Sequence, residues 1–120
     1  IDPERQVALV ATIQADEGEQ AIGVARFSRA TKAGDEAEVA IVIRDDFQKK
    51  GLGTYMMLKL TQIARTMGIK RFIAWTLPQN YAIQYLFRKI GLPVKQKTML
   101  GETQFLIYVD AIASSQANHP

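Results

Sequence analysis

A basic loop with two glycines stands directly before an amphipathic stretch of the chain and has the sequence Gln48-Lys49-Lys50-Gly51-Leu52-Gly53-Thr54. The first N–H groups of a helix have no intrahelical partner and carry the positive end of the helix dipole, so a helix start is an anion site. Gly51 and Gly53 would let an anion approach the backbone, and Lys49 and Lys50 would add positive charge. The residue types and their spacing predict a phosphate-binding loop.

The spacing of this loop differs from both common nucleotide-binding signatures. A Walker loop requires a glycine, four residues and then Gly-Lys-Ser/Thr, which this chain lacks. A dinucleotide loop needs a glycine where Met56 stands. The phosphate that the loop is predicted to hold therefore belongs to another kind of ligand.

Carboxylates are the side chains left for acid–base chemistry. The chain has no cysteine, and its one histidine, His119, lies beside the terminal Pro120 in a polar tail. This composition excludes a cysteine nucleophile or a thiolate metal site and speaks against a histidine triad. Asp45 and Asp46 have no companions at metal-ligand spacing, so we predict loop solvation there and no metal site.

The composition describes one ordinary globular domain. The 120 residues are 48% hydrophobic and 22% charged, which suffices for a core without disulfides or a metal. The net charge of +3 favours an anionic ligand, but the basic residues form no long tract, so we expect no nucleic acid partner. The apolar runs are too short to cross a bilayer, and no signal segment opens the chain. We therefore expect no membrane partner and a cytoplasmic setting.

Two periodicities define the elements that position the loop. Three segments rich in valine, isoleucine and alanine, separated by polar turns, predict an antiparallel meander. These segments are Gln6–Ile13, Ala21–Ala30 and Ala37–Arg44. After the loop, apolar residues recur at helical spacing from Leu52 to Met67, and Gly68 is placed to end the helix.

The second half of the chain contains a strand, a helix and a closing hairpin. The strand is Arg71–Leu77, in which Phe72 and Trp75 are predicted to be core residues. Asn80 is placed to cap the following helix and Gly91 to end it. The hairpin then joins two strands around a Gly-Glu turn.

This order of elements predicts the fold class. A strand, a helix and a strand in succession place one parallel pair at the centre of a mostly antiparallel sheet. The predicted fold is therefore α/β of the α+β kind, a mixed sheet with helices on its faces. Ligands of open α/β sheets gather at the carboxyl ends of such a pair, and the glycine loop occupies that end.

Two motifs in this context resemble those of the GNAT superfamily of N-acetyltransferases. The loop from Gln48 to Gly53 resembles the superfamily's Gln/Arg-x-x-Gly-x-Gly/Ala pyrophosphate loop. The segment NYAIQYLFRKIGL, residues 80–92, is similar to its Asn-x-x-Ala-x-x-x-Tyr-x-x-x-Gly-Phe helix. The resemblance extends over roughly residues 7–109. It implies acetyl-CoA as cosubstrate and direct attack of an amine on the thioester.

A narrower likeness concerns the acceptor. The stretches IDPERQVALVA, EAEVAIVIRDDFQKKGLGT, IARTMGIKRF and LPQNYAIQYLFRKIGL resemble the acetyltransferase module of bacterial protein lysine acetyltransferases, often fused to an acyl-CoA synthetase-like region. This likeness implies a protein lysine as acceptor and a fused or regulating neighbouring domain. Two alternatives stay open, namely an acetyltransferase for a small amine and a non-catalytic acyl-CoA sensing module.

The resemblance also implies roles for individual residues. Glu38, thirteen residues before Gly51, matches the strand position of the general base in several protein acetyltransferases, with Glu36 as the fallback. A solvated strand glutamate is the alternative interpretation of Glu38. The backbone groups of residues 41–43, which are Ile41, Val42 and Ile43, would contact the pantetheine arm in a strand that the superfamily usually distorts with a bulge. Asn80 is equally a coenzyme ligand or a helix cap.

The chain departs from the superfamily pattern in two places. It begins at Ile1 in a strand pattern, so we expect a fragment without the usual first strand and helices, with a core over residues 1–110 and a polar tail over 111–120. The tyrosine often credited with protonating the leaving thiolate is replaced by Phe87, which cannot donate a proton. Tyr85 lies on a different helical face.

Overall fold

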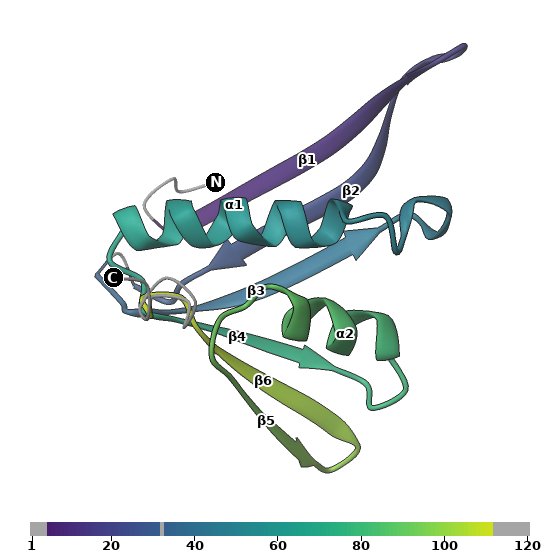
Figure 1. The fold of residues 1–120 in the computed structure, drawn as a ribbon. Coiled ribbons are helices and arrows are strands. Elements are labelled where there is room, and N and C mark those ends of the chain that lie inside the picture. The colour runs from purple at the N-terminus through teal and green to yellow at the C-terminus, as the bar shows by residue number, and fades with distance from the viewer. Residues whose placement is uncertain (1–4, 32, 112–120) are drawn as a thin grey trace, which may run out of the picture.

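Six strands form one mixed sheet in the order β1-β2-β3-β4-β6-β5 in a computed structural model of the protein (Figure 1). The structure describes residues 5–31 and 33–111, so His119 and all of the predicted tail except Ala111 lie outside the described residues. The elements are β1 (Gln6–Ala15), β2 (Gly18–Ser28), β3 (Glu36–Ile43), the 3-10 turn η1 (Asp45–Phe47), α1 (Leu52–Thr66), β4 (Arg71–Thr76), α2 (Tyr81–Lys89), β5 (Val94–Met99) and β6 (Glu102–Tyr108). The predicted order of elements is confirmed.

The parallel pair predicted at the centre of the sheet is β3 and β4. The other neighbouring strands pair antiparallel. The pairing of β3 with β4 runs only from Glu36↔Arg71 to Glu38↔Ile73. Beyond these residues the two strands diverge, as Figure 1 shows, and β3 leans toward β2 while β4 stays paired with β6 through Thr76. The sheet is therefore open between β3 and β4 at their carboxyl ends.

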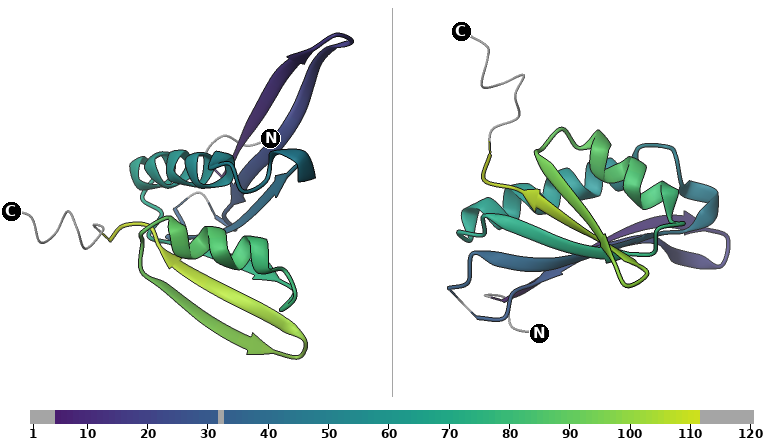
Figure 2. Two further views of the ribbon diagram at one scale, coloured as in Figure 1. Left: turned by 45° about the vertical axis from the view of Figure 1, so that its right-hand side comes forward. Right: turned by 90° about the horizontal axis from the view of Figure 1, so that it is seen from below.

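Both helices lie on one face of the sheet (Figures 1 and 2). Burial alternates along β3, where Ala37, Val39 and Ile41 are buried beneath the helices, while the residues between them are exposed. Four phenylalanines anchor the core, and they are Phe27, Phe72, Phe87 and Phe105. In the described part of the chain no element covers the opposite face, which we call the open face, and no helix is long and apolar enough to span a membrane.

The bulge in this sheet is not where the resemblance suggested. The register of β3 with β2 runs without interruption from Gly23↔Ile43 to Ser28↔Glu38, so the predicted bulge in β3 is wrong. The register shifts instead between β1 and β2 beside Ala11 and Thr12. Gly23, on the neighbouring strand β2, leaves room for the Ile43 side chain, because a Cβ there would lie 2.9 Å from Ile43 Cδ1. The opening of the sheet thus comes from the divergence of β3 and β4.

Gly53 brings the start of α1 close to α2. A Cβ at Gly53 would lie 2.2 Å from Leu86 Cδ1 and 3.7 Å from Ile43 Cγ1, so its missing side chain faces the neighbouring helix and strand. Gly53 is therefore required for the close packing of α1 against α2, whatever its role toward an anion. Gly51 differs, because it adopts φ 87° and a Cβ there would meet nothing within 4 Å.

We expect Gly53→Ala to be less stable than helix propensity predicts, by about 1 kcal/mol or more, because the Leu86 side chain must move to make room for the new methyl group. Helix propensity by itself favours alanine over glycine by about 1 kcal/mol within a helix. Urea unfolding would measure the change in the free energy of unfolding. In a Leu86→Ala background the same substitution should be neutral or stabilising. Equal destabilisation in both backgrounds would contradict the packing explanation.

Candidate active site

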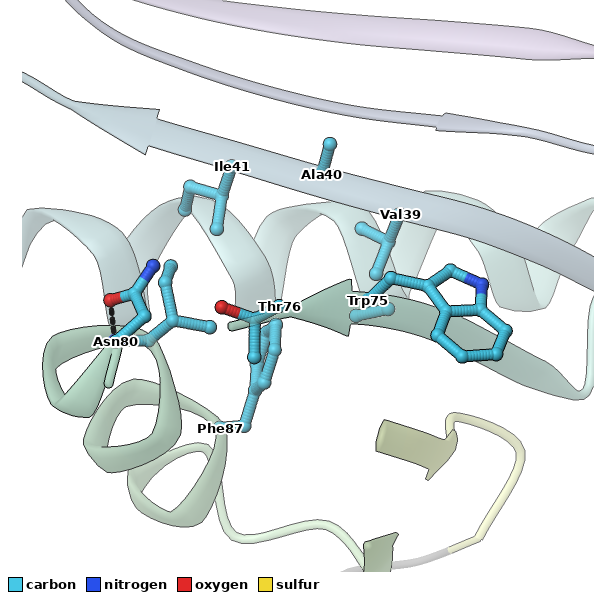
Figure 3. A pocket seen from close by; sticks show the side chains of 9 residues that line it. Val39, Ala40, Ile41, Trp75, Thr76, Asn80 and Phe87 are labelled. Carbon is cyan, nitrogen blue, oxygen red and sulfur yellow. Dashed lines mark hydrogen bonds between the residues drawn. The ribbon is translucent and has the colours of Figure 1, made fainter. Parts of the chain in front are cut away.

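A pocket opens where β3 and β4 part (Figure 3). Its volume is about 120 Å³, below the roughly 300–1,000 Å³ of pockets that enclose whole small molecules. The lining comes from two strands and one helix, with Val39, Ala40 and Ile41 from β3, Ala74, Trp75 and Thr76 from β4, and Asn80, Ile83 and Phe87 from α2 and its cap. The pocket therefore suits the narrow end of a longer ligand that continues out of it.

The backbone of β3 has unpaired polar groups at this opening. The Arg44 N–H donates to the Ile22 carbonyl at 2.8 Å, which continues the ladder with β2. Because backbone direction alternates along a strand, Val42 also directs its N–H and C=O toward β2, whereas Ile41 and Ile43 direct theirs toward β4. Pairing with β4 has ended at Glu38, so the backbone of Ile41 faces the opening without a partner strand. Of the three predicted backbone contacts, Val42 alone points away from the opening.

The loop before α1 is held in shape by its own side chains. Gln48 Nε2 donates to the Ile43 carbonyl at 3.0 Å and to Asp45 Oδ1 at 3.2 Å. Arg44 donates to both carboxylate oxygens of Asp46, at 2.7 and 3.0 Å, and these hydrogen bonds lower the pKa of Asp46. Gln48 and the two aspartates are therefore engaged in holding the shape of the loop.

The N–H groups of the loop are available to a ligand. Lys49 and Gly51 adopt the left-handed φ values of 62° and 87°. From Lys49 to Thr54 the backbone N–H groups donate no hydrogen bond within residues 5–31 and 33–111. Lys49 and Lys50 are exposed, and Lys50 Nζ lies 5.4 Å from the centre of the Phe47 ring. The features expected of an anion site thus occur together at the start of α1.

Asn80 serves as a helix cap and also lines the pocket. Its Oδ1 accepts a hydrogen bond from the Ile83 N–H at 3.2 Å, which satisfies one donor of the first turn of α2. Its Nδ2 lies on the side of Ile41 and has no acceptor among the described residues (Figure 3). The two interpretations of Asn80 are therefore compatible, because they use different atoms.

Phe87 lines the pocket at the position where the superfamily pattern has tyrosine. It is 1% exposed and packs edge to face against Phe105, with ring centres 5.1 Å apart. Tyr85 is 56% exposed and does not line the pocket. The polar side chains that do line it are Thr76, Asn80 and the indole of Trp75.

The two candidate bases differ in their partners. The Glu36 carboxylate accepts a hydrogen bond from Arg71 Nε at 2.8 Å, and this bond is the main cause that raises the pKa of Arg71. Glu38 stands on the open face at the last pair of β3 with β4, is exposed, and has no hydrogen bond or ion pair in the described part of the chain. Glu38 is therefore the carboxylate free to act at the opening.

Trp75 was wrongly predicted as a core residue. Its side chain is 44% exposed and contributes to the pocket, whereas Phe72 is fully buried as predicted. The strand alternation contained the signal, because Trp75 is an odd number of residues from Phe72 and so lies on the opposite face of β4. No cluster of three or more potential metal ligands occurs in the described part of the chain.

Comparisons with known proteins agree with this geometry. The profile described as "Acetyltransferase (GNAT) family" matches residues 2–92. The chain is 36% identical over 70 residues to Acetyltransferase Pat of Mycolicibacterium smegmatis, covering 58% of this chain and 21% of that protein. The GNAT domain of S. lividans PAT superposes with a TM-score of 0.77 at 31% identity, covering 88% of this chain and 62% of that one.

A third relative is larger. A cAMP-binding acyltransferase from Mycobacterium smegmatis superposes with a TM-score of 0.78 at 26% identity, covering 94% of this chain and 34% of that structure. The chain thus spans about a fifth of the curated Pat protein and about a third of this acyltransferase. These relatives contain regions that have no counterpart in the present sequence.

The two roles of Asn80 are separable by substitution. Asn80→Asp keeps the capping oxygen and should change the free energy of unfolding little, whereas Asn80→Ala should cost about 1 kcal/mol. Both variants lose the Nδ2 donor, so acetyl-CoA should bind more weakly to both. Thermal unfolding and calorimetric titration would measure the two effects. Unchanged affinity of Asn80→Asp would show that Nδ2 is not a ligand.

Proposed function

Because the chain belongs to the GNAT family of acetyltransferases, we propose that it transfers the acetyl group of acetyl-CoA to the side-chain amine of a protein lysine. The observation that carries the proposal is the divergence of β3 from β4 beside two helix N-termini. This divergence leaves an unpaired backbone edge beside a small pocket, and the basic loop at the start of α1 follows shortly after β3. An extended coenzyme with a phosphate at one end and a thioester at the other matches that order.

The proposed coenzyme position uses backbone groups more than side chains. The pyrophosphate would lie on the N–H groups from Lys49 to Thr54, near the positive end of the α1 dipole. The amides of the pantetheine arm would pair with Ile41 in place of the missing strand, with Asn80 Nδ2 as an additional donor. The thioester would then reach the pocket between Val39 and Ala74.

Glu38 supplies the base in the proposed reaction. A lysine amine has a pKa of about 10.4, so near neutral pH it must lose a proton before attack. Glu38 accepts that proton, directly or through water. The amine nitrogen then forms a bond to the thioester carbonyl carbon, the C–S bond breaks, and coenzyme A leaves as the thiolate. A second proton is released as the amide forms, and the thiolate takes up a proton.

The leaving group can depart without a tyrosine. A cysteine thiol has a pKa of about 8.5, and thiols in general are far more acidic than alcohols, so a thiolate can leave without prior protonation. Phe87 provides no proton, whereas the Thr76 hydroxyl and Asn80 Nδ2 are hydrogen-bond donors that line the same pocket. These two groups are positioned to stabilise the developing negative charge on sulfur.

A protein acceptor is supported by the shape of the open face and by the relatives. Glu38 lies on a face that no described element covers, so a folded partner can bring a lysine to it. The similarity to Acetyltransferase Pat supports acetyl transfer, and the resemblance of the sequence to protein lysine acetyltransferase modules points to this acceptor. A cytoplasmic setting and a neighbouring regulatory domain belong to this proposal, the latter because the relatives are longer.

Charge reversal in the loop should weaken coenzyme binding without disturbing the fold. We expect Lys49→Glu combined with Lys50→Glu to weaken acetyl-CoA binding at least about tenfold, equivalent to about 1.4 kcal/mol, because negative charge then stands beside the pyrophosphate. Calorimetry would measure this affinity. Both lysines are exposed, so this test avoids the packing defect that any side chain at Gly53 introduces.

Two controls make the loop experiment specific. Lys59→Glu reverses a single charge on the exposed surface of α1, half of the change made in the double variant, and should leave affinity nearly unchanged. S-acetylpantetheine lacks the pyrophosphate, so it should bind more weakly than acetyl-CoA. Its affinity should be the same for the wild type and the double variant. Equal weakening for both ligands would place the pyrophosphate elsewhere.

Glu38→Gln should slow acetyl transfer by about a hundredfold to ten-thousandfold at neutral pH, with partial recovery at high pH, where more amine is already neutral. Glu36→Gln is the matched control and should retain activity, because Glu36 is engaged with Arg71. Mass spectrometry of lysine acetylation on a folded acyl-CoA synthetase would measure the rate. The opposite result for the two variants would move the base to Glu36.

The same assay tests the acceptor class when free polyamines and amino acids are included. Rapid acetylation of a free amine without protein modification would favour a metabolite enzyme. Tight acetyl-CoA binding without any transfer would favour a sensing module. Acetylation of protein lysines in preference to the free amines supports the proposal.

A further inference from the structure

An exposed aromatic ring stands beside the free carboxylate on the open face. Trp75 is 44% exposed at the carboxyl end of β4, and it is the only tryptophan in the chain. Glu38 is paired in register with Ile73, and Trp75 is the next residue of β4 on the same face. Both side chains therefore stand where the sheet begins to open, on the same face of neighbouring strands.

Several large hydrophobic residues are exposed in the described part of the chain, and among them Trp75 is the one that lines this pocket. A tryptophan at this position buries only part of its large apolar surface, and its ring takes no part in the aromatic or cation contacts of the core. Phe72 and Ala74, which alternate with it, are buried on the helix side. The indole is therefore accessible at the mouth of the pocket, on the same face as the exposed Glu38.

The charges around this pair leave Glu38 available to a cation. Arg71 lies diagonally across on β4, but its guanidinium is bound to Glu36 and to Asp35 at 2.8 and 3.2 Å. Arg26 on β2 lies diagonally on the other side and forms no ion pair with Glu38. The remaining neighbours in the row of Glu38, Ser28 and Ile73, are uncharged.

We propose that Trp75 and Glu38 together form the acceptor site, in which the indole face packs on the alkyl chain and ammonium of a lysine and the carboxylate pairs with that ammonium. This inference rests on the proposed lysine acetyltransferase activity and names the residues that select its acceptor. A cation is attracted to the face of an aromatic ring, most strongly to tryptophan, and the attraction grows when the site is desolvated. Glu38 then removes the proton from the amine that it has helped to bind.

The two residues select a particular chemical class. A primary ammonium on an unbranched alkyl chain can cover the indole with its methylene groups and still reach the carboxylate. A neutral side chain of the same length gains only the apolar contact. The bound ammonium lies at the mouth of the pocket that Trp75 shares with Val39, where the thioester is proposed to lie.

Kinetics of Trp75 variants would test this site in the full chain. We expect Trp75→Leu to raise the KM for a lysine-containing acceptor about threefold to thirtyfold, because it removes the ring but keeps an apolar side chain. Trp75→Phe should recover part of the loss, and the KM for acetyl-CoA should stay the same in both. Val10→Ala removes an exposed apolar side chain on the same face, at β1, and serves as the control.

Tryptophan fluorescence provides a second readout that needs no catalysis. Because Trp75 is the only tryptophan, a lysine peptide should change the emission saturably, whereas the same peptide with norleucine in place of lysine should bind more weakly. Glu38→Gln should weaken the response to the lysine peptide. An equal response to both peptides would overturn the cation site.

The outcomes separate this inference from the proposed function. An acceptor KM that is unchanged in Trp75→Leu, in a protein that acetylates lysine, would overturn the acceptor site and leave the function intact. A raised KM for acetyl-CoA instead would assign Trp75 to the coenzyme. Failure of the wild type to transfer acetyl groups, together with a lysine-specific fluorescence response, would overturn the function while supporting the site.

Discussion

The separation of β3 from β4 after the pair Glu38↔Ile73 is the constraint on which the rest of the site depends. A parallel pair in the middle of a sheet normally satisfies its backbone groups along its full length. Here β3 continues to Ile43 and β4 to Thr76 without pairing to each other, so polar backbone groups face an opening. An extended ligand with amides of its own can complete the sheet there, which explains why a short pocket suffices for recognition of a long molecule.

The packing of the two helices positions the loop at the other end of that opening. Both crossovers place their helices on the same face, so the N-termini of α1 and α2 point to the carboxyl ends of the strands (Figure 1). Gly53 allows α1 to lie against Leu86 of α2, because a side chain at Gly53 would overlap the Leu86 methyl group. An apolar contact between the helices therefore helps to position the proposed anion site beside the pocket, although the chemistry proposed at both places is polar.

The two faces of the sheet have different tasks in the proposed reaction. The helix face holds the core and the pocket lining from α2, including Phe87 and Asn80. The open face displays Glu38 and Trp75. A coenzyme entering from the helix ends and an acceptor approaching the open face would meet at the vertex between the strands, where neither blocks the other. Direct transfer between two substrates requires such an arrangement, because both must be bound at once.

The sequence by itself determined the order of elements, the central parallel pair, the loop at the start of α1 and the loss of a hydroxyl at Phe87, because periodicity, capping residues and glycine spacing act over a few neighbouring residues. Only the tertiary structure decided that Gly53 serves packing and that the bulge lies in the β1–β2 pair. It also decided that Val42 directs its backbone away from the opening and that Glu36, unlike Glu38, is bound to Arg71. Trp75 depends on both kinds of information. Strand alternation places it on the face opposite Phe72, but its exposure depends on whether another element covers that face. These features arise from contacts between residues far apart in the chain, and local patterns do not specify which strands separate or which side chains meet.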